Sequence, residues 1–167
     1  MSNNKEKNLY YLHELDSYKV KSDYPDVRGW YLKDENSKTL GKVDNLLVNK
    51  NTERVVYLDV EVDKDIISKN HKPYSNKAGD GAHEILNEEG ENHLIVPIGL
   101  VTLDNENHIV NSTSINHQTF SETKRHRKHE IIDRHYEITV LDSYNRDQDN
   151  EYPDDDSLYS REEYNAK

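Results

Sequence analysis

Arg54-Val55-Val56-Tyr57-Leu58-Asp59-Val60-Glu61-Val62 carries the most regular pattern of apolar and polar residues in the chain. The even-numbered positions from 56 to 62 are all Val or Leu, whereas the odd positions between them are Tyr57, Asp59 and Glu61. Because successive side chains of a strand point to opposite faces, this alternation predicts a strand with one buried face. On that interpretation Asp59 and Glu61 are surface acids, able to take up protons like any acidic surface.

The residues before this strand predict two more strands and the turns that join them. Leu40-Gly41-Lys42-Val43-Asp44-Asn45-Leu46-Leu47-Val48 is rich in apolar residues, and the turn cluster Asn49-Lys50-Asn51-Thr52 follows it. Trp30-Tyr31-Leu32 is a shorter candidate, separated from the next strand by a polar stretch over residues 34–38 that fits a hairpin loop.

The residues after the strand are less regular. Residues 63–92 form a long polar insertion, which we expect to be a mobile excursion between two strands. Strand character resumes over residues 93–103, where Pro97 cannot donate to a ladder and should lie at an edge or a bulge. His108-Ile109-Val110 predicts a further short strand.

The two ends of the chain are harder to assign. Residues 9–20 fit either a short strand or a helical turn, and residues 114–120 predict a brief helical turn. Residues 130–141 fit either a helix or a last strand, and the alternation of Tyr, Ile and Val over residues 136–140 favours a strand in the second half. We expect disorder in residues 1–8 and in an acidic tail, residues 145–167, because such polar segments bury too little apolar area to offset their ordering entropy.

Composition bounds the size of the core. The chain has 167 residues, of which 32% are hydrophobic and 33% charged. That allows one compact domain with polar loops and ends. Several short strands with little helix predict a mainly β fold, either a small barrel or a sandwich, since closure removes exposed sheet edges. The motifs described below favour a small closed barrel with a C-terminal extension of strand and short helix.

Charge and cysteine content exclude several classes of protein. The formal net charge of −11 repels phosphates, and the one basic run, Lys124-Arg125-His126-Arg127-Lys128-His129, reads as a solvated loop, so we expect no nucleic-acid partner. The chain has no cysteine, which excludes disulfides and thiolate metal sites. We see neither a signal peptide nor an apolar run long enough for a membrane helix, and expect a soluble, cytoplasmic protein.

Four short motifs resemble those of PRC-barrel domains. Asp26-Val27-Arg28-Gly29-Trp30 resembles the family's entry motif, and Leu40-Gly41-Lys42-Val43-Asp44-Asn45-Leu46-Leu47-Val48-Asn49 resembles its Gly-x-Val-x-Asp-Leu strand. Arg54-Val55-Val56-Tyr57-Leu58-Asp59-Val60 resembles the next strand, and Val96-Pro97-Ile98-Gly99 the Pro-Ile-Gly step that follows.

The resemblance extends beyond the barrel. Ile115-Asn116-His117-Gln118-Thr119-Phe120 and residues 130–144 are similar to the water-exposed part of photosynthetic reaction-centre H subunits, so that the resemblance covers residues 9–144. Those subunits carry an N-terminal membrane helix, which we do not find here. The chain therefore looks like a free-standing relative without that helix.

The resemblance implies barrel-building roles, not catalytic ones, for its motif positions: Asp26, Arg28, Gly29, Trp30, Gly41, Val43, Asp44, Tyr57, Pro97 and Gly99. We expect Gly29 and Gly41 to permit a bend or a close backbone approach. We expect Asp44 to accept hydrogen bonds from turn amides, and Arg28 to pair with it or with another carboxylate.

The sequence carries no phosphate-binding loop, nucleophile elbow or zinc-protease motif. Among nine histidines, His126, His129 and His135 have a spacing that a zinc ion could use on a helix. His126 lies among Lys and Arg, which disfavour a cation. We therefore predict no catalytic residue, no cofactor and no metal site, and we do not expect an enzyme.

Three functions stay open. Twelve tyrosines, a residue type enriched at interfaces, favour a protein-interaction or scaffolding module, with a stress-related role and homodimerisation among the options. The tyrosines can equally cover a thin core. The likeness to H subunits implies, as an alternative, a part in membrane electron or proton transfer, and a small-ligand or metal-binding barrel is the third option.

Overall fold

A computed structural model describes residues 9–15, 26–69, 73, 87–146 and 151–165. The predicted segments 1–8, most of the insertion and residues 147–150 lie outside this part of the chain. The strands are β1 (Leu9–Tyr11), β2 (Tyr31–Lys33), β3 (Thr39–Asn49), β4 (Arg54–Val62), β5 (His93–Pro97), β6 (Val101–Asp104) and β7 (Ile109–Ser112). The α-helices are α1 (Lys64–Lys69), α2 (His117–Ser121) and α3 (Arg134–Tyr144), and the 3-10 turns are η1 (Leu12–Glu14), η3 (Ile98–Leu100), η4 (Asp156–Ser160) and η5 (Glu162–Tyr164).

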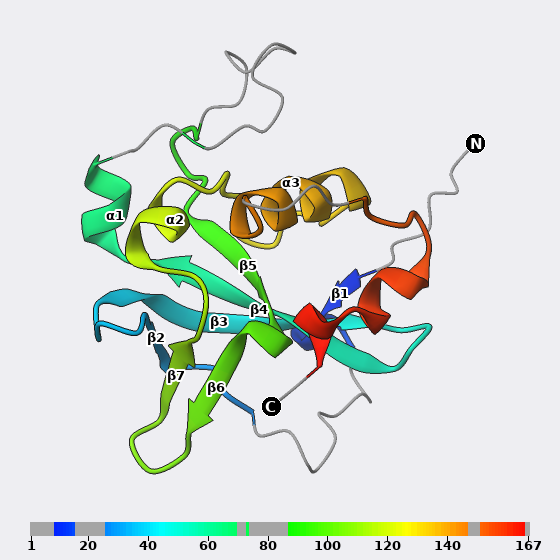
Figure 1. Cartoon of the computed structure of the whole chain (residues 1–167), viewed down its shortest axis with the longest axis horizontal. Coiled ribbons are helices and arrows are strands. Elements are labelled where there is room, and N and C mark those ends of the chain that lie inside the picture. Colours follow the sequence, from blue (N-terminus) through cyan, green and yellow to red (C-terminus); the bar gives the residue numbers. More distant parts are fainter. Residues whose placement is uncertain (1–8, 16–25, 70–72, 74–86, 147–150, 166–167) are drawn as a thin grey trace.

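All seven strands belong to one curled sheet with the order β5-β4-β3-β2-β7-β6, and β1 pairs with β3 as well (Figure 1). The pairings are antiparallel, except that β2 and β7 run parallel. β5 and β6 stand at opposite ends of this order, yet only the three residues of η3 join them. So short a link forces the two ends of the sheet toward each other.

The mainly β prediction is thus confirmed, but closure of a barrel is not. β5 and β6 do not pair, and the described strands form a curled open sheet, a half-barrel. Pro97 lies where expected, at the end of the edge strand β5. None of the helices formed by the described residues has the length and apolar character needed to cross a lipid bilayer.

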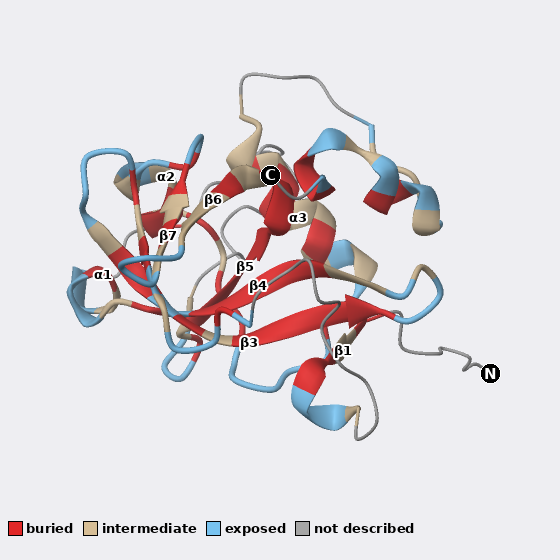
Figure 2. Ribbon diagram, turned by 90° about the horizontal axis from the view of Figure 1, so that it is seen from below, coloured by how far each residue is buried: buried red, intermediate tan, exposed pale blue. Residues whose placement is uncertain are grey.

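Both faces of the central strands are buried, which corrects the prediction of one buried face (Figure 2). Leu58 and Val60 belong to the inner cluster, whereas Tyr57 packs in a second cluster on the outer face. Leu47 pairs with Tyr57 and Val48 with Val55, so Val56 is an extra residue. This bulge turns Val56 into the outer cluster and breaks the simple alternation.

The outer face is covered by a helix, α3, where the sequence left helix and strand open and favoured a strand over residues 136–140. α3 begins after Asp133, whose side chain accepts a hydrogen bond from the backbone N–H of Tyr136 at 2.9 Å. Its buried positions include Glu137, Val140 and Leu141, a spacing of three and four residues that suits a helix. The alternation over residues 136–140 was therefore a misleading signal.

The expected disorder of the acidic tail is not confirmed. Residues 151–165 include the turns η4 and η5, and Leu158, Tyr159 and Tyr164 are fully buried on the outer face of the sheet. The prediction of disorder relied on the average composition of the tail. That average does not show that three large side chains of the tail can be buried against the outer face of the sheet. The start of the insertion also differs from expectation, because residues 64–69 form α1.

Candidate functional site

A buried carboxylate, Asp59, lies at the centre of a polar cluster on the outer face of the sheet. Its Oδ2 lies 3.1 Å from Nδ1 of His93, and its Oδ1 lies 3.0 Å from Nε2 of His126. The side chain of Asp59 has no solvent exposure, and the two imidazoles are 2% exposed. The prediction that Asp59 is a surface acid is therefore wrong, because α3 and the segment before it cover this face.

Backbone pairing positions the two histidines. His93 is the first residue of β5 and pairs with Glu61 of β4, two positions along the strand from Asp59. His126 comes from the connection between α2 and α3. The backbone N–H groups of His93 and His126 each donate to the carbonyl of the other, at 3.0 and 2.8 Å, which fixes the connection along the edge of β5.

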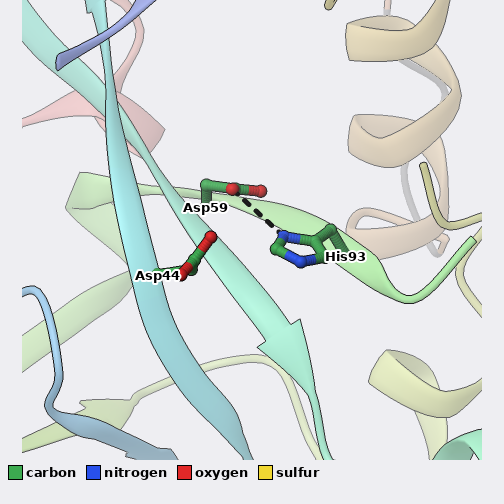
Figure 3. Close-up of side chains that lie close together, drawn as sticks. All are labelled: Asp44, Asp59 and His93. Atoms are coloured by element: carbon green, nitrogen blue, oxygen red, sulfur yellow. Dashed lines mark hydrogen bonds and ion pairs between the residues drawn. The ribbon is translucent and has the colours of Figure 1, made fainter. Parts of the chain in front are cut away.

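Asp44 joins the cluster because of a second bulge. Val43 pairs with Val60 and Asn45 with Asp59, so Asp44 is an extra residue in β3. Its carboxylate lies beside Asp59 and His93, and one donor atom from each of the three lies within 4.8 Å of the other two (Figure 3). Asp44 is the only partly exposed member of this trio.

The two hydrogen bonds of His126 show that a proton or another cation lies between its Nε2 and the carboxylate of Asp59. Its Nδ1 lies 2.7 Å from the carbonyl oxygen of Arg127, which can only accept, so Nδ1 carries a hydrogen. A neutral imidazole would then present a lone pair on Nε2 to the carboxylate of Asp59. Two acceptors cannot share a hydrogen bond, so a proton or another cation must lie at this contact.

The electrostatics of Asp59 agree with an ionised carboxylate. Burial raises the pKa of Asp59. Hydrogen bonds and positive charge from His126 and His93 lower this pKa by more, so the net shift is downward. Without metal, the cluster is best described as the Asp59 carboxylate paired with a charged His126, with His93 donating to the second oxygen.

The donor set suits a divalent transition-metal ion. Imidazole nitrogen and carboxylate oxygen are ordinary ligands of Zn²⁺, and imidazole disfavours Mg²⁺ and Ca²⁺, which prefer oxygen. His126 would then orient Asp59 from outside the ligand sphere by holding its other oxygen, the usual way in which ligating carboxylates are positioned.

A second polar cluster lies nearby, around Glu137 of α3. The hydroxyls of Tyr57 and Tyr159 donate to its Oε1 at 2.8 and 2.6 Å, and Nε of Arg134 lies 3.3 Å from its Oε2. Burial raises the pKa of Glu137 more than these partners lower it. Tyr57, one of the motif positions, is thus a buried anchor.

The entry-motif residues lie away from both clusters. Arg28 pairs with Asp26 through a salt bridge of 2.5 Å on the surface, and not with Asp44. Gly29 has φ +94°, a conformation that L side chains rarely adopt. Trp30 stacks on His108 with ring centroids 4.8 Å apart.

The remaining motif positions have packing roles. A Cβ on Gly41 would lie 2.3 Å from the carbonyl oxygen of Glu61, and one on Gly99 would lie 2.5 Å from that of Glu163. Val43 is buried in the inner cluster, and Pro97 pairs with Tyr57 at the end of β5.

The histidine trio considered from the sequence is not brought together. His126 is buried against Asp59, whereas His129 and His135 are exposed. The ring of His129 lies instead 4.6 Å from that of His13. Sequence reasoning missed the importance of Asp59 and His93. The available signal was that Asp59 lies two residues after Tyr57 and therefore shares a strand face with it. Aromatic side chains cover that face in the structure.

Comparison with known proteins finds no family model that matches the chain and no curated protein that is significantly similar to it. Membership of the PRC-barrel family therefore stays a prediction, based on the motifs quoted above.

Proposed function

We propose that the chain is a non-catalytic binding protein whose sheet holds one divalent transition-metal ion between Asp44, Asp59 and His93. The observation that carries this proposal is the convergence of three donor groups within 4.8 Å, two of them on buried side chains, at a bulge that turns Asp44 toward the others.

The spacing is close to what an ion requires. Each ligand atom lies about 2.1 Å from a tetrahedral zinc ion, so two ligands of one ion are about 3.4 Å apart. Because the donor atoms of the trio lie within 4.8 Å of one another, the widest pair needs to contract by up to about 1.4 Å. A rotation of the partly exposed Asp44 side chain can supply that movement.

The charges also favour a cation. Two carboxylates and a neutral imidazole offer two negative charges, and the charged His126, which keeps its hydrogen bond to the far oxygen of Asp59, leaves the site with one net negative charge to attract the ion. The ion would displace the hydrogen that His93 shares with Asp59. Open coordination positions would face the side of Asp44, where the site meets solvent.

Calorimetric titration tests the proposal. Protein freed of metal with a chelator is titrated with Zn²⁺ and, separately, with Mn²⁺, and the bound metal is counted by mass spectrometry. We expect one Zn²⁺ per chain, and at least about tenfold weaker binding in Asp44→Asn and His93→Gln. Glu106→Gln, which removes an exposed carboxylate outside the site, is the matched control.

The design separates ligand loss from unfolding. Asp44 is partly exposed and at a bulge, so its amide variant should keep the far-UV circular dichroism of the parent. Equal Zn²⁺ affinity in Asp44→Asn and Glu106→Gln, with both variants folded, would sink the proposal. So would the absence of any saturable binding in the parent.

A protein-interaction module is the second candidate, and the edge strand β6 favours it. Among the described strands β6 pairs only with β7, so its other side is open to a strand from a partner. Tyrosines give this candidate little support, since Tyr31 is the only tyrosine of the described residues with a largely exposed side chain. Light scattering over a concentration series and a pull-down test this candidate, and a monomer that captures no protein would contradict it.

A part in electron transfer stays a prediction from the resemblance, and co-fractionation with membranes would test it.

A further inference from the structure

Residues 151–165 pack on the outer face of the sheet in the way that a bound peptide packs on its receptor. Residues 151–165 lie across the end of β4 and beside α3 (Figure 1). Three side chains of this segment, Leu158, Tyr159 and Tyr164, have no solvent exposure. The rings of Tyr159 and Tyr164 pack edge-to-face with each other at 5.3 Å and with Tyr57 at 6.4 and 5.4 Å.

Two arginines outside the segment bind its main chain. Arg54 of β4 donates to the carbonyl oxygens of Tyr159 and Tyr164. Arg134 of α3 donates to those of Pro153 and Asp155. Contacts to main-chain carbonyls bind a peptide in one register, while pockets for alternate side chains add selectivity.

The hydrogen bonds made by the hydroxyls of Tyr159 and Tyr164 require tyrosine at both positions. Tyr57 has one hydroxyl hydrogen and donates it to Glu137, so the contact between Tyr57 and Tyr164 at 2.7 Å must take its hydrogen from Tyr164. Tyr159 donates to the same carboxylate oxygen at 2.6 Å. Phenylalanine at either position would leave a buried acceptor without one of its donors.

The receptor has a glycine where the segment's main chain crosses it. A Cβ on Gly99 would lie 2.5 Å from the carbonyl oxygen of Glu163 and 2.6 Å from that of Glu162. Only glycine allows so close an approach of two backbones. The segment itself contributes only the short turns η4 and η5, which cannot hold a shape alone in water, so its shape comes from the surface beneath it.

We propose that this surface is a peptide-binding groove, filled in cis by residues 151–165 and open to the same segment of a second copy of the chain. The groove consists of Arg54, Tyr57, Gly99, Arg134 and Glu137. Its ligand is an acidic peptide with Leu and Tyr adjacent and a second Tyr five residues later. This inference is independent of the metal site.

The test uses the whole chain with a protease site replacing residues 147–150. After cleavage, the nicked protein is diluted, and displacement of its C-terminal fragment by a fluorescent peptide of residues 151–167 is followed by anisotropy. We expect saturable, reversible exchange. Peptides with Tyr164→Phe or Tyr159→Phe should bind at least about tenfold more weakly, whereas Ser160→Ala, at an exposed position, should bind like the parent.

Substitutions in the added peptide leave the receptor unchanged, so a folding defect cannot imitate the expected result. A nicked protein that unfolds, or that never exchanges its fragment, would show that the segment is an integral part of the core and would overturn the proposal. Equal binding of all four peptides would overturn it too.

Exchange of residues 151–165 between two copies of the chain is tested separately, by the oligomeric state of the intact protein. Intact chains incubated at high concentration should form a dimer that excess free peptide dissociates, and Gly99→Ala should lose peptide binding and dimer formation together. An intact chain that stays monomeric at every concentration, and into which labelled peptide never enters, would refute exchange between copies.

Discussion

Nε2 of His126 lies 3.0 Å from Oδ1 of Asp59, although 67 residues separate the two positions. The contact joins the connection before α3 to the middle of the sheet, and both side chains are buried. It also fixes the charge of the site, because the second nitrogen of His126 is committed to the carbonyl of Arg127.

Removing the charge of Asp59 should destabilise the fold. In Asp59→Asn two buried imidazoles lose the carboxylate to which both are hydrogen-bonded, so we expect a loss of about 3 kcal/mol in the free energy of unfolding. Urea denaturation in the presence of a chelator measures this loss without a contribution from metal. A loss below about 1 kcal/mol would contradict the assignment of a buried ion pair.

The surface pair of Arg28 and Asp26 should behave differently. The two side chains are 38% and 46% exposed, so water screens their attraction. We expect Arg28→Ala to cost less than about 1 kcal/mol by the same denaturation assay. A cost equal to that of Asp59→Asn would mean that the entry motif has a structural role which its contacts do not reveal.

Two glycines should differ in their sensitivity to alanine. Gly41→Ala places a methyl group against the backbone of Glu61, which cannot move without disturbing the pairing of β3 with β4, and we expect a loss of about 3 kcal/mol. Gly29→Ala meets no atom within 4 Å and is strained only by its positive φ, which should cost about 1 kcal/mol. Thermal melts of the two variants would show the reverse order if the close approach at Gly41 were unimportant.

Glu137 should make stability fall as pH rises. Burial raises its pKa, so the folded chain binds the proton more tightly than the unfolded chain does. Stability from the protonated form is complete below the ordinary value of 4.5 and is lost as pH climbs from there through the raised folded value. The variant Glu137→Gln cannot ionise.

The measurement is the difference in unfolding free energy between the parent and Glu137→Gln over a pH series. This difference should shift in favour of the variant as pH rises through that window, and the contributions of other groups cancel in it. A difference that does not change with pH would show that Glu137 has the same pKa folded and unfolded.

Zinc should stabilise the folded chain in proportion to its binding. At a free concentration one hundred times the dissociation constant, a ligand specific to the folded state adds about 2.7 kcal/mol. We expect a matching rise in the melting temperature of the parent, reversed by a chelator, and a much smaller rise in Asp44→Asn. Equal shifts in the two proteins would place the bound zinc elsewhere.

Local patterns were enough for most of the strands. Alternation located β4, and turn residues on either side located β3 and the break before β5, because one buried face imposes a period of two on the sequence. The edge position of Pro97 followed from its missing N–H. The chemistry of the site did not follow, since Asp59 looks from the sequence like any acid on a solvated face.

Strand periodicity and turn chemistry act between near neighbours, so the β-rich character, the short strands and the small core could be predicted from the order of residues alone. Three features depend on how distant segments pack: the covered outer face, the helix over residues 134–144 and the order of residues 151–165. The tertiary structure also decided that two bulges turn Asp44 and Val56 out of register. The physical reason is the same in each case: the burial of a polar or aromatic side chain depends on partners 22 to 110 positions away, as in the contacts Asp59–His126 and Arg54–Tyr164, and no short-range pattern carries that information.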